Sequence, residues 1–249
     1  MGAWELYLLF FVVAFVYASV GFGGGSSYLA LLALFGVSYT IARSTSLMCN
    51  ITVVLGSVVL YHRWGLLAWK RLLPLVALSV PAAFLGGYYP LTERTFYLLL
   101  GFALIAAAST TWFSPRLRHM DEEDSSPPGD WSFLEVALGA GIGLLSGMVG
   151  IGGGIFLAPA LYLLHWGNPR QIAAACSLFI LVNSAAGLAG QMLSPIFEFD
   201  WQFALPLVGC VLLGGQLGVR VAKGWFPAVY IRKGTALLIF YVAIRLLMK

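Results

Sequence analysis

Long apolar stretches alternate with short polar breaks along almost the whole chain of 249 residues. Several of these stretches approach the ~20 apolar residues that a helix needs to cross a bilayer. Two are shorter and, as helices, would span only ~15 Å. The pattern predicts a polytopic helical membrane protein, with apolar segments at Trp4–Val20, Ser26–Phe35, Thr40–Tyr61, Leu72–Tyr88, Thr95–Phe113, Phe133–Val149, Ile155–His165, Gln171–Leu193, Trp201–Val219 and Val229–Met248.

The first short stretch follows a glycine turn that recurs in the second half of the chain. V-G-F-G-G-G at 20–25 returns as V-G-I-G-G-G at 149–154, an offset of 129 residues. Further matches follow in order: Ile41-Ala42 and Ser46-Leu47 recur at offset 131 as Ile172-Ala173 and Ser177-Leu178, and Leu85-Gly86 recurs at offset 132 as Leu217-Gly218. The sequence therefore contains an internal duplication in which each copy carries a helix-breaking glycine turn.

One clearly polar stretch, Ser114–Trp131, separates the two copies. It contains a run of four acidic residues followed by serines, prolines and a glycine, a composition typical of a hydrophilic linker. We therefore predict an all-α protein with a first membrane repeat at 1–113, a linker at 114–131 and a second membrane repeat at 132–249. Each repeat would consist of a glycine-broken hairpin and three transmembrane helices.

The distribution of lysine and arginine bears on the orientation of the repeats. If each glycine-broken segment crosses the membrane once, the basic residues divide seven against seven and select no orientation. If the chain turns back at the glycines, ten lie on one side and only Arg43, Arg94, Arg245 and Lys249 on the other. This favours inverted repeats with both termini outside and the linker in the cytoplasm. The count does not separate a re-entrant hairpin from two full crossings.

The glycine turns are the first candidate site, because an unpaired amide inside a bilayer is costly unless it faces water or protein. A helix that starts after such a turn would direct free N–H groups and a partial positive charge at a small anion. In the first copy, Ser26 and Ser27 suit the N-cap of the following helix. The alternative interpretation is that the glycines only allow close packing of helices.

Polar residues crowd the segment after each glycine turn, and hydroxyl and amide groups can bind an oxyanion and still release it. Ser46 and Ser177 are repeat partners, although such residues also hold membrane helices together. Arg43 could bind an anion bidentately or extend to the lipid headgroups; its repeat partner is Ala174. The predicted substrate-binding residues are Gly23, Gly24, Gly25, Ser26, Ser27, Arg43, Ser44, Thr45, Ser46, Asn50, Gly152, Gly153, Gly154, Cys176, Ser177 and Asn183.

The acidic residues argue against cation transport, which usually needs carboxylates within the membrane. None of the ten falls in the middle of a predicted span, and Glu135 is grouped with those beside the linker. No arrangement of a nucleophile with a base and no metal-binding spacing is present, so we expect no enzyme activity, metal or cofactor. The net charge of +4 is small and the basic residues fall in predicted loops, so we expect no nucleic-acid partner. The eight tryptophans, Trp166 among them, fall near segment ends, as in an interfacial belt.

The duplicated glycine turns and the matched stretches after them resemble the sulfite exporter TauE/SafE family of permeases. The resemblance extends from about Leu6 to Leu246. It implies a location in the cytoplasmic (inner) membrane and transport of sulfite, organosulfonates or related small sulfur-containing anions. The two copies differ at two places that could alter the substrate. Arg43 of the first copy corresponds to Ala174 of the second, and Ser26 and Ser27 correspond to Ile155 and Phe156.

These observations together predict a secondary transporter that moves a small sulfur-containing anion by alternating access. A passive anion channel and a permease for a different small anion are the alternatives. A purely structural membrane protein is disfavoured by the polar clusters in both halves. The sequence leaves open a coupling ion, such as a proton or sodium, and a homo-oligomeric state.

Overall fold

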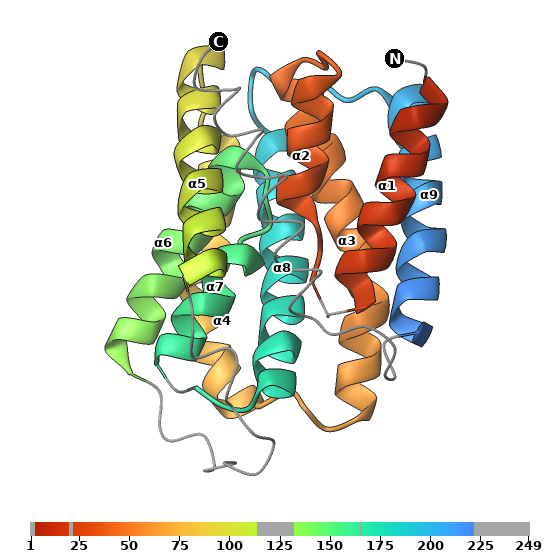
Figure 1. The fold of residues 1–249 in the computed structure, drawn as a ribbon. Coiled ribbons are helices and arrows are strands. Elements are labelled where there is room, and N and C mark those ends of the chain that lie inside the picture. The colour runs from red at the N-terminus through yellow and green to blue at the C-terminus, as the bar shows by residue number, and fades with distance from the viewer. Residues whose placement is uncertain (1–2, 20–21, 114–131, 165, 222–249) are drawn as a thin grey trace.

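The computed structural model describes residues 3–19, 22–113, 132–164 and 166–221, in which every regular element is an α-helix. The helices form a bundle (Figure 1). Their bounds are α1 (Ala3–Ser19), α2 (Gly25–Leu34), α3 (Tyr39–Arg63), α4 (Trp69–Tyr88), α5 (Glu93–Phe113), α6 (Phe133–Val149), α7 (Gly154–Leu163), α8 (Pro169–Met192) and α9 (Trp201–Val221). The prediction of an all-α fold is confirmed for these residues. The predicted linker and the segment Val229–Met248 lie outside them.

Four described helices are long and apolar enough to cross a membrane: α3, α4, α8 and the part of α9 from Trp201 to Arg220. Their most apolar windows have mean hydropathy between 1.4 and 2.0. Shorter apolar helices accompany them, namely α2, α7 and the 10–17-residue helices at Trp4–Ser19 and Phe133–Val149. The chain is therefore a multi-pass membrane protein, as the hydrophobic pattern predicts.

Both short helices begin directly after a glycine in the left-handed conformation. Gly24 (φ 83°) precedes α2 and Gly153 (φ 83°) precedes α7. Residues with a Cβ avoid this conformation, so glycine sets the start of each helix. The prediction that Ser26 or Ser27 caps α2 is wrong, because the helix already begins at Gly25 and both serines lie inside its first turn. Instead, the Ser27 hydroxyl hydrogen-bonds to the Tyr17 hydroxyl, 3.0 Å away.

One long helix from each half of the chain packs against helices of the other half. Helix α4 packs mainly against α6 and α8 of the second half, and α9 packs mainly against α1 and α3 of the first. The centre of the bundle is the contact between α3 and α8, which are equivalent helices of the two copies. We call α1, α2, α3 and α9 the first group, and α4, α6, α7 and α8 the second group.

Glycines allow the exchanged helices to approach their partners at backbone distance. A Cβ built on Gly86 of α4 would lie 2.2 Å from the carbonyl oxygen of Leu144 in α6. A Cβ on Gly218 of α9 would lie 2.2 Å from the carbonyl oxygen of Phe15 in α1. Gly86 and Gly218 are repeat partners, so the duplicated Leu-Gly pair marks the same helix contact twice.

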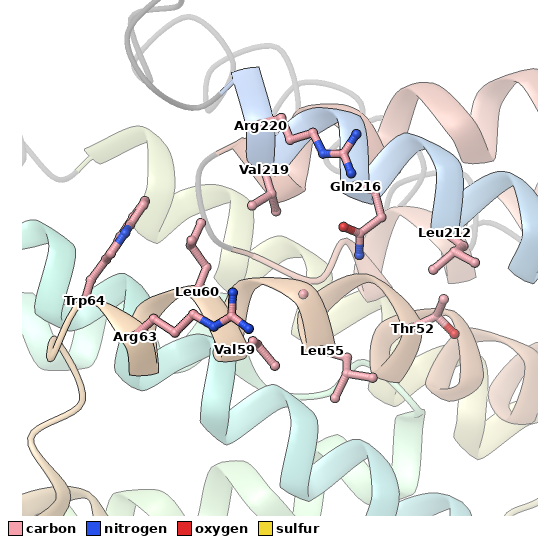
Figure 2. Close-up of a pocket in the computed structure, with 11 residues that line it drawn as sticks. Thr52, Leu55, Val59, Leu60, Arg63, Trp64, Leu212, Gln216, Val219 and Arg220 are labelled. Atoms are coloured by element: carbon pink, nitrogen blue, oxygen red, sulfur yellow. The ribbon is translucent and has the colours of Figure 1, made fainter.

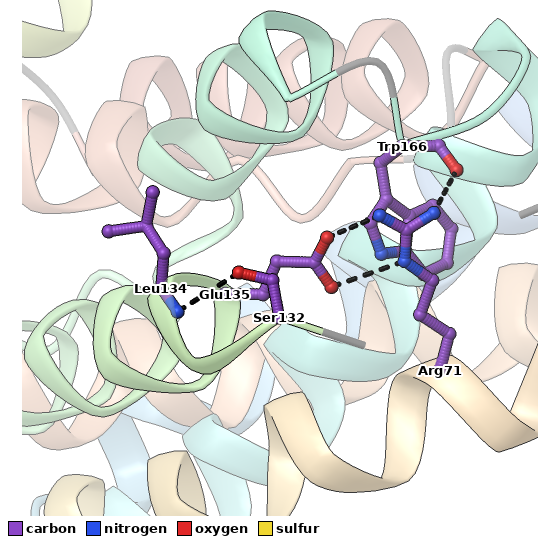
Figure 3. Close-up of polar contacts among 5 residues, drawn as sticks. All are labelled: Arg71, Ser132, Leu134, Glu135 and Trp166. Carbon is purple, nitrogen blue, oxygen red and sulfur yellow. Dashed lines mark hydrogen bonds and ion pairs between the residues drawn. The ribbon is translucent and has the colours of Figure 1, made fainter. Parts of the chain in front are cut away.

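The second group is also held by a buried ion pair that the sequence did not reveal (Figure 3). Glu135 in the first turn of α6 is 3% exposed and accepts two hydrogen bonds from the Arg71 guanidinium of α4, one of them 3.1 Å long from Nε. Arg71 also donates to the Trp166 carbonyl at 3.1 Å and lies 5.2 Å from the centroid of its ring. We call Arg71, Glu135 and Trp166 the clasp. Glu135 thus lies beside the linker, as predicted, but it is buried and paired. The prediction that Trp166 is an interfacial tryptophan is wrong, because it is 1% exposed inside the bundle.

Candidate functional site

The two glycine turns meet at Asn50, near the middle of α3. The Asn50 Nδ2 atom donates to the carbonyl oxygen of Ile151, in the second turn, at 2.9 Å. A Cβ added to Gly25, which follows the first turn, would lie 2.3 Å from that same oxygen. Segments 126 residues apart in the chain are thus in backbone contact, and the asparagine side chain lies between them.

Asn50 occupies the space that side chains on the turns would need. A Cβ on Gly23 would lie 2.7 Å from the Asn50 Oδ1 atom, and a Cβ on Gly152 would lie 2.8 Å from Nδ2. The same position on Gly152 is 2.9 Å from the hydroxyl of Ser184 in α8. Glycine is therefore required at 23 and 152 by the neighbouring side chains, and at 25 by the Asn50 side chain and the Ile151 backbone; Gly152 is also held at φ 86°. Asn50 and Ser184 are both fully buried.

Hydrogen-bonding capacity at this junction is incompletely used. Within the described residues, the Asn50 Oδ1 atom and the hydroxyls of Ser184 and Tyr28 are buried without a partner. Neither α2 nor α7 has a side-chain N-cap, and their first free amides find no acceptor in the described part of the chain. Two helix N-termini, each with a partial positive charge, thus begin beside one buried amide side chain. The helix amides and the hydroxyls are donors that suit a small anion, whereas the Asn50 Oδ1 atom is an acceptor.

Arg43, Ser46 and Asn50 lie along one face of α3, because they are spaced three and four residues apart. The Ser46 hydroxyl donates to the carbonyl of Gly25 at 3.2 Å. The backbone of Arg43 lies beside the second turn: a Cβ on Gly150 would be 3.1 Å from the Arg43 Cα atom. This face of α3, with one cation and two polar side chains, therefore runs along both glycine turns.

Arg43 is buried inside the bundle, with 2% of its surface exposed. Its guanidinium donates to the carbonyls of Gly87 and Gly147, each at 3.5 Å, and its Nε atom has no partner among the described residues. A cavity of about 10 Å³ lies beside it, lined also by Gln191 and Glu198. The alternative of an arginine that extends to the headgroups is wrong, because helices α4 and α6 enclose the side chain. These long bonds leave the guanidinium weakly satisfied.

The remaining predicted residues divide between this junction and other contacts. Gly24, Gly153 and Gly154 shape the turns and the helix starts. Ser44 donates to the carbonyl of Glu198, at the end of α3 away from Asn50, and Asn183 donates to the Ser79 hydroxyl of α4. Ser177 donates to Ala173 within its own helix. Ser26, Thr45 and Cys176 are buried near the turns or in the packing around them.

Sequence reasoning gave no role to the carbonyl of Ile151 and left Ser184 out of the predicted site. The Val-Gly-Ile-Gly-Gly-Gly motif draws attention to its amides, whereas the contact with Asn50 uses a carbonyl. Ser184 was visible as part of a polar cluster, but Asn183 beside it carries the same signal, and only the packing shows which side chain faces the turn.

Comparison with known proteins agrees with a membrane transporter. The sulfite exporter TauE/SafE family matches residues 6–246. The probable membrane transporter protein y4hK of Sinorhizobium fredii is 32% identical over 246 residues, which cover 97% of each chain. The probable membrane transporter protein YunE of Bacillus subtilis is 26% identical over 242 residues, which cover 88% of each chain. No solved structure matches. The chain belongs to the sulfite exporter TauE/SafE family of membrane transporters.

Proposed function

We propose that this protein is a secondary transporter of the cytoplasmic membrane that carries a small sulfur-containing anion, such as sulfite or an organosulfonate. The observation that carries the proposal is the meeting of two uncapped helix N-termini at Asn50. The anion would lie where the amides that begin α2 and α7, the Asn50 amide group and the Ser184 hydroxyl converge. The family match and the names of the relatives support a transporter.

The chemistry of this junction suits binding followed by release. Amide and hydroxyl donors contribute no formal charge, so they can hold an oxyanion without trapping it. Arg43 supplies one buried cation along the same face of α3. No described carboxylate forms an ion pair with it. A bound anion would therefore offset a buried charge that is otherwise costly.

The transport cycle would follow alternating access between inverted repeats, with both termini outside and residues 114–131 in the cytoplasm. In Figure 1, α1 runs from the upper end of the bundle downward, whereas α6 begins at the lower end. These opposite directions support inversion. The short helices α2 and α7 support hairpins that turn back within the membrane, since 10 residues of helix span ~15 Å, about half of the hydrocarbon core.

The test is flux of radiolabelled sulfite and a sulfonate into proteoliposomes that contain the purified protein, with sulfate beside them. We expect saturable uptake that is lost in Asn50→Asp, because this isosteric change places a negative charge between the two helix N-termini. Accumulation against a concentration gradient, driven by an imposed proton or sodium gradient, would identify a secondary transporter. Flux that only dissipates a gradient would identify a passive channel instead.

A matched control is Gly141→Ala on α6, where an added Cβ meets no atom within 4 Å. This variant should transport like the unmodified protein. Thermal unfolding in detergent shows whether Asn50→Asp is folded. Undiminished sulfite uptake by a folded Asn50→Asp protein would contradict the proposed binding site. If the unmodified protein transports only a different anion, the proposed substrate is wrong.

A further inference from the structure

An open groove of about 660 Å³ lies between α3 and α9, on the opposite side of α3 from the glycine turns. Gly56, Val59 and Arg63 contribute from α3, and Gln216, Val219 and Arg220 from α9 (Figure 2). The Gln216 amide extends from α9 toward α3: a Cβ on Gly56 would lie 2.7 Å from its Nε2 atom. The groove takes no part in the transport site described above.

The groove lies where two close glycine contacts of the repeat-equivalent crossing have no counterpart. In the second group, a Cβ on Gly87 of α4 would lie 2.1 Å from the Gly187 carbonyl of α8. At offsets of 132 and 131, the equivalents of Gly87 and Gly187 are Val219 and Gly56. Valine thus stands where the other crossing has one of its two glycines, and its side chain lines the groove.

A second contact differs in the same way. A Cβ on Gly190 of α8 would lie 2.1 Å from the Phe84 carbonyl of α4. The equivalent residues, Val59 and Gln216, both line the groove. The two altered contacts involve positions 56 and 59 of α3, which are three residues apart, so the difference extends over about one helical turn.

The walls and one end of the groove differ in chemistry. Leu55 and Leu212 are 52% and 46% exposed, in helices that are apolar enough to cross a membrane, so they face lipid. Arg63 and Arg220 lie in the last turns of α3 and α9 and are exposed. Neither forms an ion pair with a described residue. Trp64, beside them, is 47% exposed and marks a membrane interface.

We infer that this groove binds an anionic phospholipid. The phosphate group would lie at Arg63 and Arg220, and an acyl chain would follow the apolar walls toward Leu55 and Leu212. Basic residues between transmembrane helices are suited to anionic headgroups, and an apolar groove open to the bilayer is filled by lipid chains. A phospholipid thus matches both the cationic end and the apolar walls of the groove, whereas a free phosphate would contact only the cationic end.

Native mass spectrometry of the purified protein tests this inference, with phosphatidylglycerol and phosphatidylcholine as probes. We expect retained phosphatidylglycerol adducts, and on the order of tenfold weaker binding in the double variant Arg63→Gln with Arg220→Gln. The double variant Lys70→Gln with Arg94→Gln removes the same charge from exposed positions elsewhere and should bind like the unmodified protein.

A second variant tests the apolar part while both arginines remain. Val59→Trp places a large side chain in the groove at a position that is already 45% exposed, so folding should tolerate it, and we expect weaker phosphatidylglycerol binding. Equal retention of both lipids, or binding that neither the arginine pair nor Val59→Trp reduces, would overturn the inference. Full competition by free glycerol phosphate would also overturn it, because the site would then recognise an anion without the acyl chain.

Discussion

The two four-helix groups descend from the same duplicated sequence, yet one is closed and the other is open. In the second group, α4 and α8 touch at backbone distance through Gly87 and Gly187. In the first group, Val219 and Gly56 occupy the equivalent positions and a groove separates α9 from α3. Changes at two glycine contacts of a helix crossing thus accompany the difference between a tight contact and a potential lipid site.

The groups also differ at the end where the clasp lies. The repeat equivalents of Arg71, Glu135 and Trp166 are Phe203, Leu6 and Phe35. These three pack in an apolar cluster of the first group. The same positions thus carry an ion pair in one group and members of an apolar cluster in the other. Duplication preserved the positions that touch and changed the chemistry of the contact.

The largest expected effect comes from breaking the clasp. Glu135→Leu alone leaves the mostly buried Arg71 guanidinium without its carboxylate, which should lower the free energy of unfolding by about 3 kcal/mol. The double variant Arg71→Phe with Glu135→Leu copies the apolar contact of the first group, and it should recover most of that loss. Chemical or thermal unfolding in detergent measures both. A double variant no more stable than the single one would show that the two contacts are not interchangeable.

The next effect concerns the closed crossing. Gly87→Ala places a methyl group 2.1 Å from the Gly187 carbonyl, so α4 and α8 must separate. We expect a loss of about 1–3 kcal/mol of stability. Gly209→Ala on α9 is the matched control, because its Cβ would meet no atom within 4 Å. Equal melting temperatures for the two variants would contradict the closed crossing.

A third prediction compares the starts of α2 and α7. Gly25→Ala directs its Cβ at the Ile151 carbonyl and the Asn50 amide, whereas Gly154→Ala meets the Ile180 side chain, which can rotate. We therefore expect sulfite uptake to fall much further in Gly25→Ala, by on the order of tenfold or more, since displacement near a binding site is costly. Proteoliposome flux at equal protein content measures the ratio. A greater loss in Gly154→Ala would reverse the proposed importance of the two turns.

The smallest change in stability should come from Val219→Gly, which restores the lost glycine. Glycine in a helix costs about 1 kcal/mol, and the closer approach of α9 to α3 should offset part of it. Spin labels at Leu55→Cys and Leu212→Cys, in a Cys210→Ala background, should report a shorter distance than in the unmodified protein. Leu213→Gly on the exposed face of α9 is the control for added glycine. An unchanged distance would show that Val219 does not hold the groove open.

The sequence predicted the candidate site only in part. The glycine turns and Asn50 were identified from a repeated motif and from polar letters in an apolar segment, and the structure brings them into contact. Asn183 and Ser177 carry the same sequence signal. However, the Asn183 amide donates to Ser79 of α4, and the Ser177 hydroxyl donates to a carbonyl of its own helix. Polarity predicts that a side chain needs a partner, but it does not say which neighbour supplies one.

The chain by itself determined the helical membrane class, the positions of the breaks and the duplication, because apolar length and glycine runs are local properties that any bilayer protein must satisfy. Only the tertiary structure decided that α4 packs with the second half of the chain and α9 with the first, that Arg71 and Glu135 form an ion pair and that Val219 lines a groove. These features depend on which helix backbones lie within a few ångströms of one another. At such close crossings, the presence or absence of a Cβ limits how near two helices can pack.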